Sequence, residues 1–433
     1  MRAVVSLFAL SVLLAQSPES PAQPQTPAMP DDIPVSQGLN MPALPAQSET
    51  LASLSRQLLE RSPWAARWQK QEAQAAAEVQ AALPIPQLSL SLDAQLRPGA
   101  QEQSARLGYT LPSQRQQQAQ LLTAQARQTE QQALVSQEKL EQLLRLHRLG
   151  YQALTLQVQL TRLPERIDVL ERLEQVAQQR ADAGLISRLD ALRLQGEAAQ
   201  LKGQQARTQA ELLTVLVSIQ GLLGLQSPVR LEGSLVEPLP LPTPELLQQQ
   251  LLQHPQLRAH QAEQQAQRAR VQGLTVGGLP EALLQGAQVE AGLWRVADGT
   301  SGPLGLGLAF SMPLTSSRIR QQQQGVEQAR LEGLEVEQAH VLQQAQVLLT
   351  GAQLQRAAEQ DRVKWLTDVQ VPRVQTLLRL TRLAYEAGEQ PLSTVMEALQ
   401  LVEATEQQRL EATHALRQAE LAVAEAAGFI PGF

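Results

Sequence analysis

Two parts of the chain place an apolar side chain at every second position. In residues 86–96 the apolar positions are Leu88, Leu90, Leu92, Ala94 and Leu96. A period of two predicts a β-strand, and about ten residues is the length of a strand that crosses a membrane. After a turn at Arg97-Pro98-Gly99, a shorter strand is expected to return, with one face made of Leu107, Tyr109 and Leu111. We therefore predict a strand pair within about 85–111.

A second strand pair is predicted within about 285–313. Its first strand carries Val289, Ala291 and Leu293 on one face, and after a turn at Asp298-Gly299 the second carries Leu304, Leu306, Leu308 and Phe310. The apolar faces of both pairs are modest, and their aromatic residues are only Tyr109, Trp294 and Phe310. The strands alone therefore fit a soluble hairpin with one buried face as well as they fit a membrane.

Periods of three and four residues elsewhere predict helices. We expect opening helices at 48–82 and 244–276, long helices at 113–182 and 314–387, and return helices at 187–223 and 391–427. Glycine tolerates the left-handed conformation in which many helices end, which makes four glycines the expected helix stops: Gly184, Gly224, Gly388 and Gly428. Residues 187–190 fit a capping box, and Pro391 fits the first position of a helix. Pro164 and Pro372 are expected to kink or break the long helices.

The first return helix carries one continuous stripe of apolar and small residues. Its spacings alternate between three and four: Leu189, Leu192, Gly196, Ala199, Gly203, Ala206, Ala210, Leu213 and Val217. A 3.5-residue period predicts coiled-coil packing. Each glycine costs about 1 kcal/mol relative to alanine inside a helix, so close packing is the expected reason for these glycines.

The same landmarks occur twice. Gly184 and Gly224 recur as Gly388 and Gly428, both at an offset of 204 residues. We therefore predict a two-fold internal repeat, with a first copy at 48–235 and a second at 236–433. In each copy the return helix and the opening helix, stacked end to end, match the length of the long helix.

The N-terminal residues have a different composition. Arg2 precedes a short apolar run, which predicts a signal peptide within residues 1–22. Residues 23–47 are rich in Pro and Gln and are expected to form a linker. No later segment is a candidate transmembrane helix, and the lack of cysteine excludes disulfides and an acylated N-terminal cysteine. The net charge of −6, without a basic stripe, argues against nucleic-acid binding.

We find no constellation of residues that would carry a reaction or hold a cofactor. The five histidines are scattered, at positions 147, 254, 260, 340 and 414. His147 and His340 are expected on helical surfaces, and His254 is expected to be structural. The sequence therefore predicts no enzyme, no metal site and no cofactor.

The order of these elements resembles TolC-type outer-membrane efflux proteins, the outer membrane factors. The most specific segments are residues 183–190, 222–224, 254–257 and 385–388, together with Pro313 and Arg318. The resemblance implies a mainly α fold with a small β part. In that fold, long antiparallel coiled-coil helices form an α-barrel, and two β-hairpins contribute to a shared transmembrane β-barrel of a homotrimer. Trimerisation would meet a physical need, because two hairpins cannot close a barrel and open strand edges are not tolerated in lipid.

The resemblance also implies a function and a location. The chain would be the outer-membrane duct of a tripartite efflux or secretion system, in contact with outer-membrane lipid, a periplasmic adaptor (membrane fusion protein) and an inner-membrane pump. The alternative is a soluble periplasmic coiled-coil adaptor or scaffold, although such adaptors carry one helical hairpin between β-rich domains.

Two sets of candidate site residues lie at the predicted helical tips. The adaptor-contact set is Gly184, Leu185, Ser187 and Gly388. The candidate aperture charges are Arg180, Asp182, Arg188, Asp190, Arg382 and Glu386. In the family, such charges hold the helices closed; solvated helix ends with a capping aspartate are the alternative. The second tip departs from the family by continuing with Glu389-Gln390-Pro391, so its partner contacts are expected to differ from those of the first tip.

Overall fold

The computed structural model describes residues 47–82, 87–97, 100–110, 114–183, 187–227, 229–274, 288–297, 304–311 and 317–429. These residues belong to one unit, 46–433, in which helices predominate and strands are few. The predicted signal peptide, and all of the predicted linker except Gln47, lie outside the described residues.

Each predicted opening helix is two helices. The first stretch begins with a short strand, β1 (Gln47–Thr50), and continues as α1 (Leu51–Glu60) and α2 (Pro63–Ala81). The chain restarts at Ser62, whose Oγ accepts a hydrogen bond from the Ala65 amide at 3.2 Å, with proline at the first helical position. The second stretch breaks in the same way into α5 (Pro244–Leu251) and α6 (Pro255–Leu274). The prediction of single helices at 48–82 and 244–276 was therefore wrong.

Both hairpins join one antiparallel sheet. Its strands are β2 (Gln87–Arg97), β3 (Ala100–Thr110), β5 (Gln288–Ala297) and β6 (Leu304–Ser311), in the order β2-β3-β5-β6. The register aligns apolar residues across all four strands, as in the row Leu90, Leu107, Ala291 and Leu308. The predicted alternation is therefore confirmed. β3 is as long as β2, not shorter, because residues 100–106, most of them polar, also pair with β2 one for one. The predicted turn residues 98–99 and 298–299 lie outside the described residues.

The long helices respond differently to their prolines. α3 (Gln114–Asp182) continues through Pro164 without a break. The second long helix is divided into α8 (Ser317–Trp365), a π-helical turn η1 (Leu366–Gln370) and α9 (Val371–Glu386). Pro372 is the second residue after this turn, and because proline lacks an N–H it cannot bond the carbonyl four residues earlier. The helix is therefore interrupted before Pro372, as predicted, whereas Pro164 does not break α3.

The two return helices have the same length and the same ending. α4 (Arg188–Leu223) and α10 (Leu392–Ala427) each contain 36 residues. Gly224 and Gly428 follow them with φ of 69° and 68°, as predicted. The next amide in each case reaches back five residues, from Leu225 to the Gln220 carbonyl (3.1 Å) and from Phe429 to the Ala424 carbonyl (2.8 Å). Each helix therefore ends in a Schellman motif.

These glycines lie against the prolines that start the opening helices. A Cβ on Gly224 would lie 2.8 Å from Pro63 Cδ, and one on Gly428 would lie 3.0 Å from Pro255 Cδ. The end of α4 therefore abuts the start of α2, and the end of α10 abuts the start of α6. The predicted end-to-end stacking of return and opening helices is confirmed.

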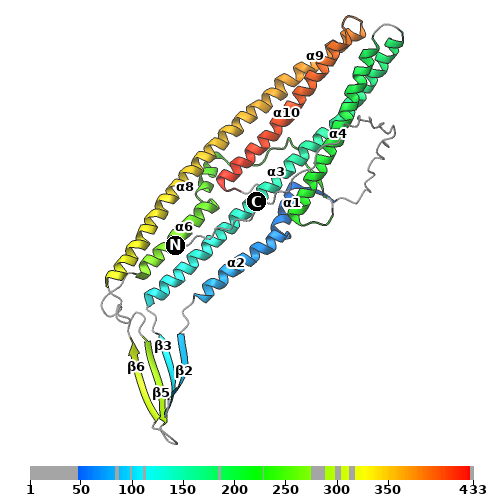
Figure 1. Cartoon of the computed structure of the whole chain (residues 1–433). Helices are drawn as coiled ribbons and strands as arrows, with labels where there is room; N and C mark the ends of the chain where they lie inside the picture. The colour runs from blue at the N-terminus through cyan, green and yellow to red at the C-terminus, as the bar shows by residue number, and fades with distance from the viewer. Residues whose placement is uncertain are drawn as a thin grey trace, which may run out of the picture. The chain divides into compact units, whose positions relative to one another are not determined.

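The described helices form a row along two stretches (Figure 1). Next to the strands the neighbours are α2, α3, α6 and α8 in that order; toward the tips they are α4, α3, α10 and α9. Between these stretches, β1 pairs in parallel with β4 (Val229–Glu232), over a core that includes Leu54, Leu143 and Ile219. One edge of the row is formed by α2 and α4, and the other by α8 and α9.

Candidate functional site at the helical tips

The tip of the second hairpin is a glycine turn with open space around it. Gly388 has φ 78°, and a Cβ placed on it would meet nothing within 4 Å. The Glu389 amide donates to the Ala384 carbonyl at 2.9 Å, so α9 also ends in a Schellman motif. α10 then begins at Leu392, with Pro391 as its N-cap and not, as predicted, its first helical residue. Gly388 therefore ends its helix as predicted.

The tip of the first hairpin is described only at its flanks. Gly184 and Leu185 lie outside the described residues. Ser187 is the N-cap of α4, and its Oγ accepts a hydrogen bond from the Leu189 amide at 3.2 Å. The predicted helix start is confirmed, but the bond comes from the second helical amide, whereas a capping box uses the third.

Four of the six candidate aperture charges have described side chains: Arg180, Asp182, Arg188 and Arg382. Asp182 accepts a hydrogen bond from Gln178 within its own helix, at 3.1 Å. Arg188 and Arg382 are exposed, and the side chains of Asp190 and Glu386 lie outside the description. Arg180 reaches the other hairpin.

Arg180 meets an aromatic ring and not a carboxylate. Its Cζ lies 4.6 Å from the centre of the Tyr385 ring, within the range of a cation–π interaction. Tyr385 is buried, and its hydroxyl has no hydrogen-bond partner in the described part of the chain. Sequence reasoning singled out Tyr385 as part of a motif but did not identify it as the partner of Arg180. Each of these residues lies about one helical turn before the glycine of a tip. This shared position is the sequence signal that could have identified the pair.

Behind the tips, the two hairpins share an apolar core. Leu163, Leu170 and Leu194 from the first hairpin pack in one buried cluster with residues of the second, Tyr385, Leu392 and Val395. This cluster holds α3 and α4 against α9 and α10, so the two tips are placed by the same packing.

Ion pairs continue the contact between α3 and α10 away from the tips. Arg162 pairs with Glu406 at 2.9 Å, Arg166 pairs with Glu403, and Arg148 pairs with Glu425. The side chains in these pairs are partly exposed, and such pairs contribute about 0–1 kcal/mol each. They set the register of the two helices more than they stabilise them.

A buried ion pair lies further along α10. The Arg417 and Glu420 side chains are 4% and 3% exposed and bond to each other. The Glu420 carboxylate also accepts the Leu239 amide at 3.2 Å, which attaches the segment before α5 to α10.

The histidines are structural where their contacts are described. His254 Nδ1 accepts the Gln256 amide at 3.2 Å and so caps α6, as expected of a structural residue. His340 lies on an exposed helix face. His147, predicted to be on a surface, is 6% exposed, and burial lowers its pKa to about 4. Within the described ranges, no three His, Cys, Asp or Glu residues lie close enough together to hold a metal ion.

Both edges of the helical row expose apolar side chains. Every residue of the stripe from Leu189 to Val217 on α4 is exposed, and a Cβ on Gly196 or Gly203 would meet nothing within 4 Å. The stripe was correctly identified as one face, but none of the described residues packs over it. The opposite edge exposes large apolar residues of α8 and α9: Val326, Val336, Val347, Leu348, Leu354, Trp365, Leu377, Leu380 and Leu383.

The apolar face of the sheet is also exposed where its burial is described. Leu308 is 84% exposed, and Leu107 and Val289 are exposed as well. Among the described helices, none has the length and apolar character needed to span a membrane.

Comparison with known proteins shows which fold this is. No protein-family model and no curated protein matches the chain. The crystal structure of the CmeC outer membrane channel of Campylobacter jejuni matches with a TM-score of 0.69 at 12% identity, over 88% of this chain and 86% of that one. The outer membrane protein VceC of Vibrio cholerae matches with a TM-score of 0.68 at 14% identity, over 88% of this chain and 96% of that one.

The open-state MtrE outer membrane channel of Neisseria gonorrhoeae gives a TM-score of 0.66 at 15% identity, over 88% of this chain and 89% of that one. These proteins are similar to the chain along almost its whole length. The chain therefore has the fold of outer-membrane channels, and the expected TolC-type fold is confirmed.

Proposed function

We propose that the chain is the outer-membrane duct of a tripartite efflux or secretion system. It conducts substrate passively from a periplasmic adaptor and an inner-membrane pump to the exterior, and the pump supplies the energy. The observation that carries the proposal is the pair of unpartnered apolar edges on a channel fold. A soluble periplasmic scaffold would place polar residues there, because large exposed apolar patches promote association.

The two edges fit a ring of three copies. The stripe of α4 in one copy packs against α8 and α9 of the next, and this head-to-tail contact closes after three steps. The sheet has two unpaired edge strands, β2 and β6, and the same ring pairs each with the next copy. The four strands of each copy then complete a twelve-stranded barrel, with the row of Leu90 and Leu308 facing lipid. Closure satisfies the backbone groups that an open edge would expose to hydrocarbon.

We further propose that the chain is an internal duplication that is exported by a signal peptide and resides in the outer membrane with its helices in the periplasm. The equal length and the matching glycine ends of α4 and α10 support the duplication. So does the repeated contact of Gly224 with Pro63 and of Gly428 with Pro255.

The tips are proposed as the adaptor-contact and gating region. Gly388 supports this role because nothing crowds it, so a helical hairpin of a partner has access to the turn. The Arg180–Tyr385 contact joins the two hairpins close to both tips, and separating the tips would have to break it.

A matched pair of variants tests the assembly. Ala199 and Gln200 are neighbours on α4, and both are exposed, but only Ala199 belongs to the stripe. Ala199→Glu should abolish the trimer, because an unpaired carboxylate would be buried between copies, whereas Gln200→Glu should leave it intact. The measurement is the mass of the detergent-extracted outer-membrane protein by light scattering. A wild-type monomer released by osmotic shock, or an Ala199→Glu trimer as stable as wild type, would overturn the proposal.

The tip assignment has a separate test. Gly184→Pro, or a bulky residue at Leu185, should impair export while leaving the trimer intact. Drug or metal tolerance is measured in a strain that depends on this duct. Unchanged tolerance in both variants would contradict the tip assignment without affecting the assembly proposal.

A further inference from the structure

A cavity of about 840 Å³ lies between four helices at the end nearest the strands. Its walls are the ends of α2 and α6, residues 119–127 of α3 and Glu327 of α8. On one side α3 and α6 come close together, since a Cβ on Gly273 would lie 2.7 Å from the Ala119 Cβ. Because two backbones approach so closely there, the cavity has a fixed wall.

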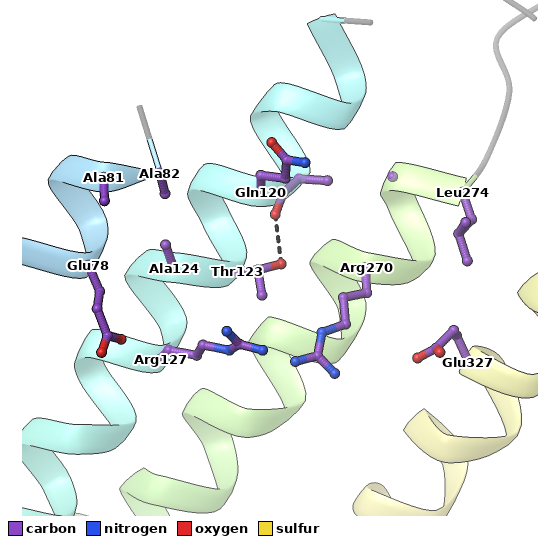
Figure 2. A pocket seen from close by; sticks show the side chains of 12 residues that line it. Glu78, Ala81, Ala82, Gln120, Thr123, Ala124, Arg127, Arg270, Leu274 and Glu327 are labelled. Carbon is purple, nitrogen blue, oxygen red and sulfur yellow. Dashed lines mark hydrogen bonds between the residues drawn. The ribbon is translucent and has the colours of Figure 1, made fainter. Parts of the chain in front are cut away.

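Two arginines from different helices converge in this cavity. Arg127 reaches in from α3 and Arg270 from α6, with their guanidinium groups pointing toward each other (Figure 2). Arg127 is exposed and Arg270 is half-buried. Two like charges that share one space repel each other, and this repulsion grows as the local dielectric falls.

Neither arginine has a carboxylate partner within ion-pair distance in the part of the chain that the structure describes. Arg270 donates a hydrogen bond to the Gln267 Oε1 at 3.3 Å. The carboxylates at the cavity wall have other donors. Glu327 accepts from Gln267 Nε2 at 2.6 Å, and Glu78 accepts from Gln74 at 3.3 Å. Each guanidinium carries five N–H donors, so most of them lack an acceptor among the described residues.

Glu130, which feels the charge of both arginines, is a poor counter-ion for them. Burial and the charge of Glu263 raise the pKa of Glu130, and these effects outweigh the attraction of Arg127 and Arg270. If the two arginines held an acidic group close to them, they would lower its pKa instead.

We propose that Arg127 and Arg270 bind one oxyanion, a phosphate or carboxylate group, between their guanidinium forks. The group relieves the repulsion between the two charges and accepts hydrogen bonds from both helices. A planar fork matches such oxygen atoms, and bonds of this kind are stronger than neutral ones. The proposal rests on this cavity and does not depend on the trimer or on export. A soluble anion and the headgroup of an anionic lipid offer the same chemistry.

The test uses the purified full chain at low ionic strength, titrated with inorganic phosphate by calorimetry. Arg127→Gln and Arg270→Gln should each weaken binding at least about tenfold, since each removes charge-assisted hydrogen bonds. Arg145→Gln on α3 and Arg258→Gln on α6 are matched controls, exposed and outside the cavity. Both controls should bind phosphate like wild type.

A second arm separates the two sources of the anion. Native mass spectrometry of protein mixed with phosphatidylglycerol should show a retained lipid that is lost in both cavity variants, if the headgroup is the natural occupant. Binding of either probe that depends on Arg127 and Arg270 supports the site. Absence of both, or equal loss in the Arg145→Gln control, overturns it.

A measurement on the wild type avoids dependence on variant folding. Phenylglyoxal modifies accessible arginines, and peptide mapping measures the rate at each position. Phosphate should slow modification of Arg127 and Arg270 at least severalfold and leave Arg145 unchanged. Equal rates with and without phosphate, when phosphatidylglycerol also gives no protection, would refute the site.

Discussion

Replacing Gly224 with alanine should destabilise the protein more than replacing Gly388 with alanine. Both glycines follow a helix in the left-handed region, with φ of 69° and 78°. They differ in what a new Cβ would meet. At Gly224 the Cβ would lie 2.8 Å from two ring carbons of Pro63, whereas at Gly388 nothing lies within 4 Å. The pair therefore separates backbone strain from crowding.

The expected magnitudes follow from these two terms. The left-handed conformation costs an L-residue about 1–2 kcal/mol, and alanine recovers about 0.4–1 kcal/mol by restricting the unfolded chain. Gly388→Ala should therefore lower the free energy of unfolding by about 1 kcal/mol. Overpacking a close contact adds about 1–3 kcal/mol, which makes the loss for Gly224→Ala about 2–4 kcal/mol. Gly428→Ala, which would meet His254 Cδ2 at 2.7 Å, should behave like Gly224→Ala.

The assay is urea denaturation followed by far-UV circular dichroism. All variants must be compared at one protein concentration, because the apparent stability of an oligomer depends on it. If Gly388→Ala costs as much as Gly224→Ala and Gly428→Ala, backbone conformation alone sets the effect. The inferred end-to-end packing of return and opening helices would then contribute nothing.

Three further predictions use the same denaturation assay. Burial lowers the pKa of His147 from 6.5 to about 4, so the stability present above pH 6.5 is lost as the pH falls toward 4, by up to about 3 kcal/mol. His147→Gln should reduce this loss. An unchanged pH dependence in the variant would show that His147 is not its source. Arg417→Met should lower the free energy of unfolding by about 3–5 kcal/mol, because it leaves the Glu420 carboxylate buried and unpaired. Adding Glu420→Leu should recover part of this loss. If it recovers nothing, the unpaired carboxylate is not the cause. Tyr385→Phe should leave the free energy of unfolding nearly unchanged, because the hydroxyl has no partner among the described residues. Tyr385→Leu removes the cation–π contact and should lower that free energy by about 0.5–2 kcal/mol. Equal effects of the two variants would exclude the ring as the stabilising group.

The sequence predicted elements whose signal is local. Alternation located the strands, and glycine located the ends of α4, α9 and α10, since both signals act within one turn or one strand. The breaks before Pro63 and Pro255 were missed, although Ser62 followed by proline is a helix-start signal. β1 was missed for a different reason. Its partner β4 is far away in the sequence, and four residues carry too little pattern to predict a strand.

The contact made by Arg180 was not predicted from the sequence. Arg180 was expected among the charges at the aperture, and it lies against the ring of Tyr385. His147 was predicted to lie on a surface because one apolar stripe along a helix indicates only one buried face. α3 contacts α1, α4 and α10, so more than one of its faces is buried. The spacing of apolar residues shows where one buried face of a helix lies, but it does not show how many other helices pack against that helix.

The stripe on α4 gains its meaning from the matching positions on α10. If the return helices are copies, Ala199, Gly203 and Ala210 correspond to Glu403, Gln407 and His414 at the offset of 204. Those residues of α10 bond to α3: Glu403 to Arg166, Gln407 to Gln159 and His414 to Thr155.

On α10, this helix face therefore makes polar contacts with the long helix α3 of the same chain. On α4 it meets no partner among the described residues, and its stripe consists of apolar and small residues. The proposed ring would place this face against the other long helix, α8 with α9, of a neighbouring copy, and that edge also exposes apolar residues. A contact between separate copies must offset the entropy of association, and burial of apolar surface is the main favourable term available. The contact within one chain bears no such cost, and polar residues suffice there to set the register.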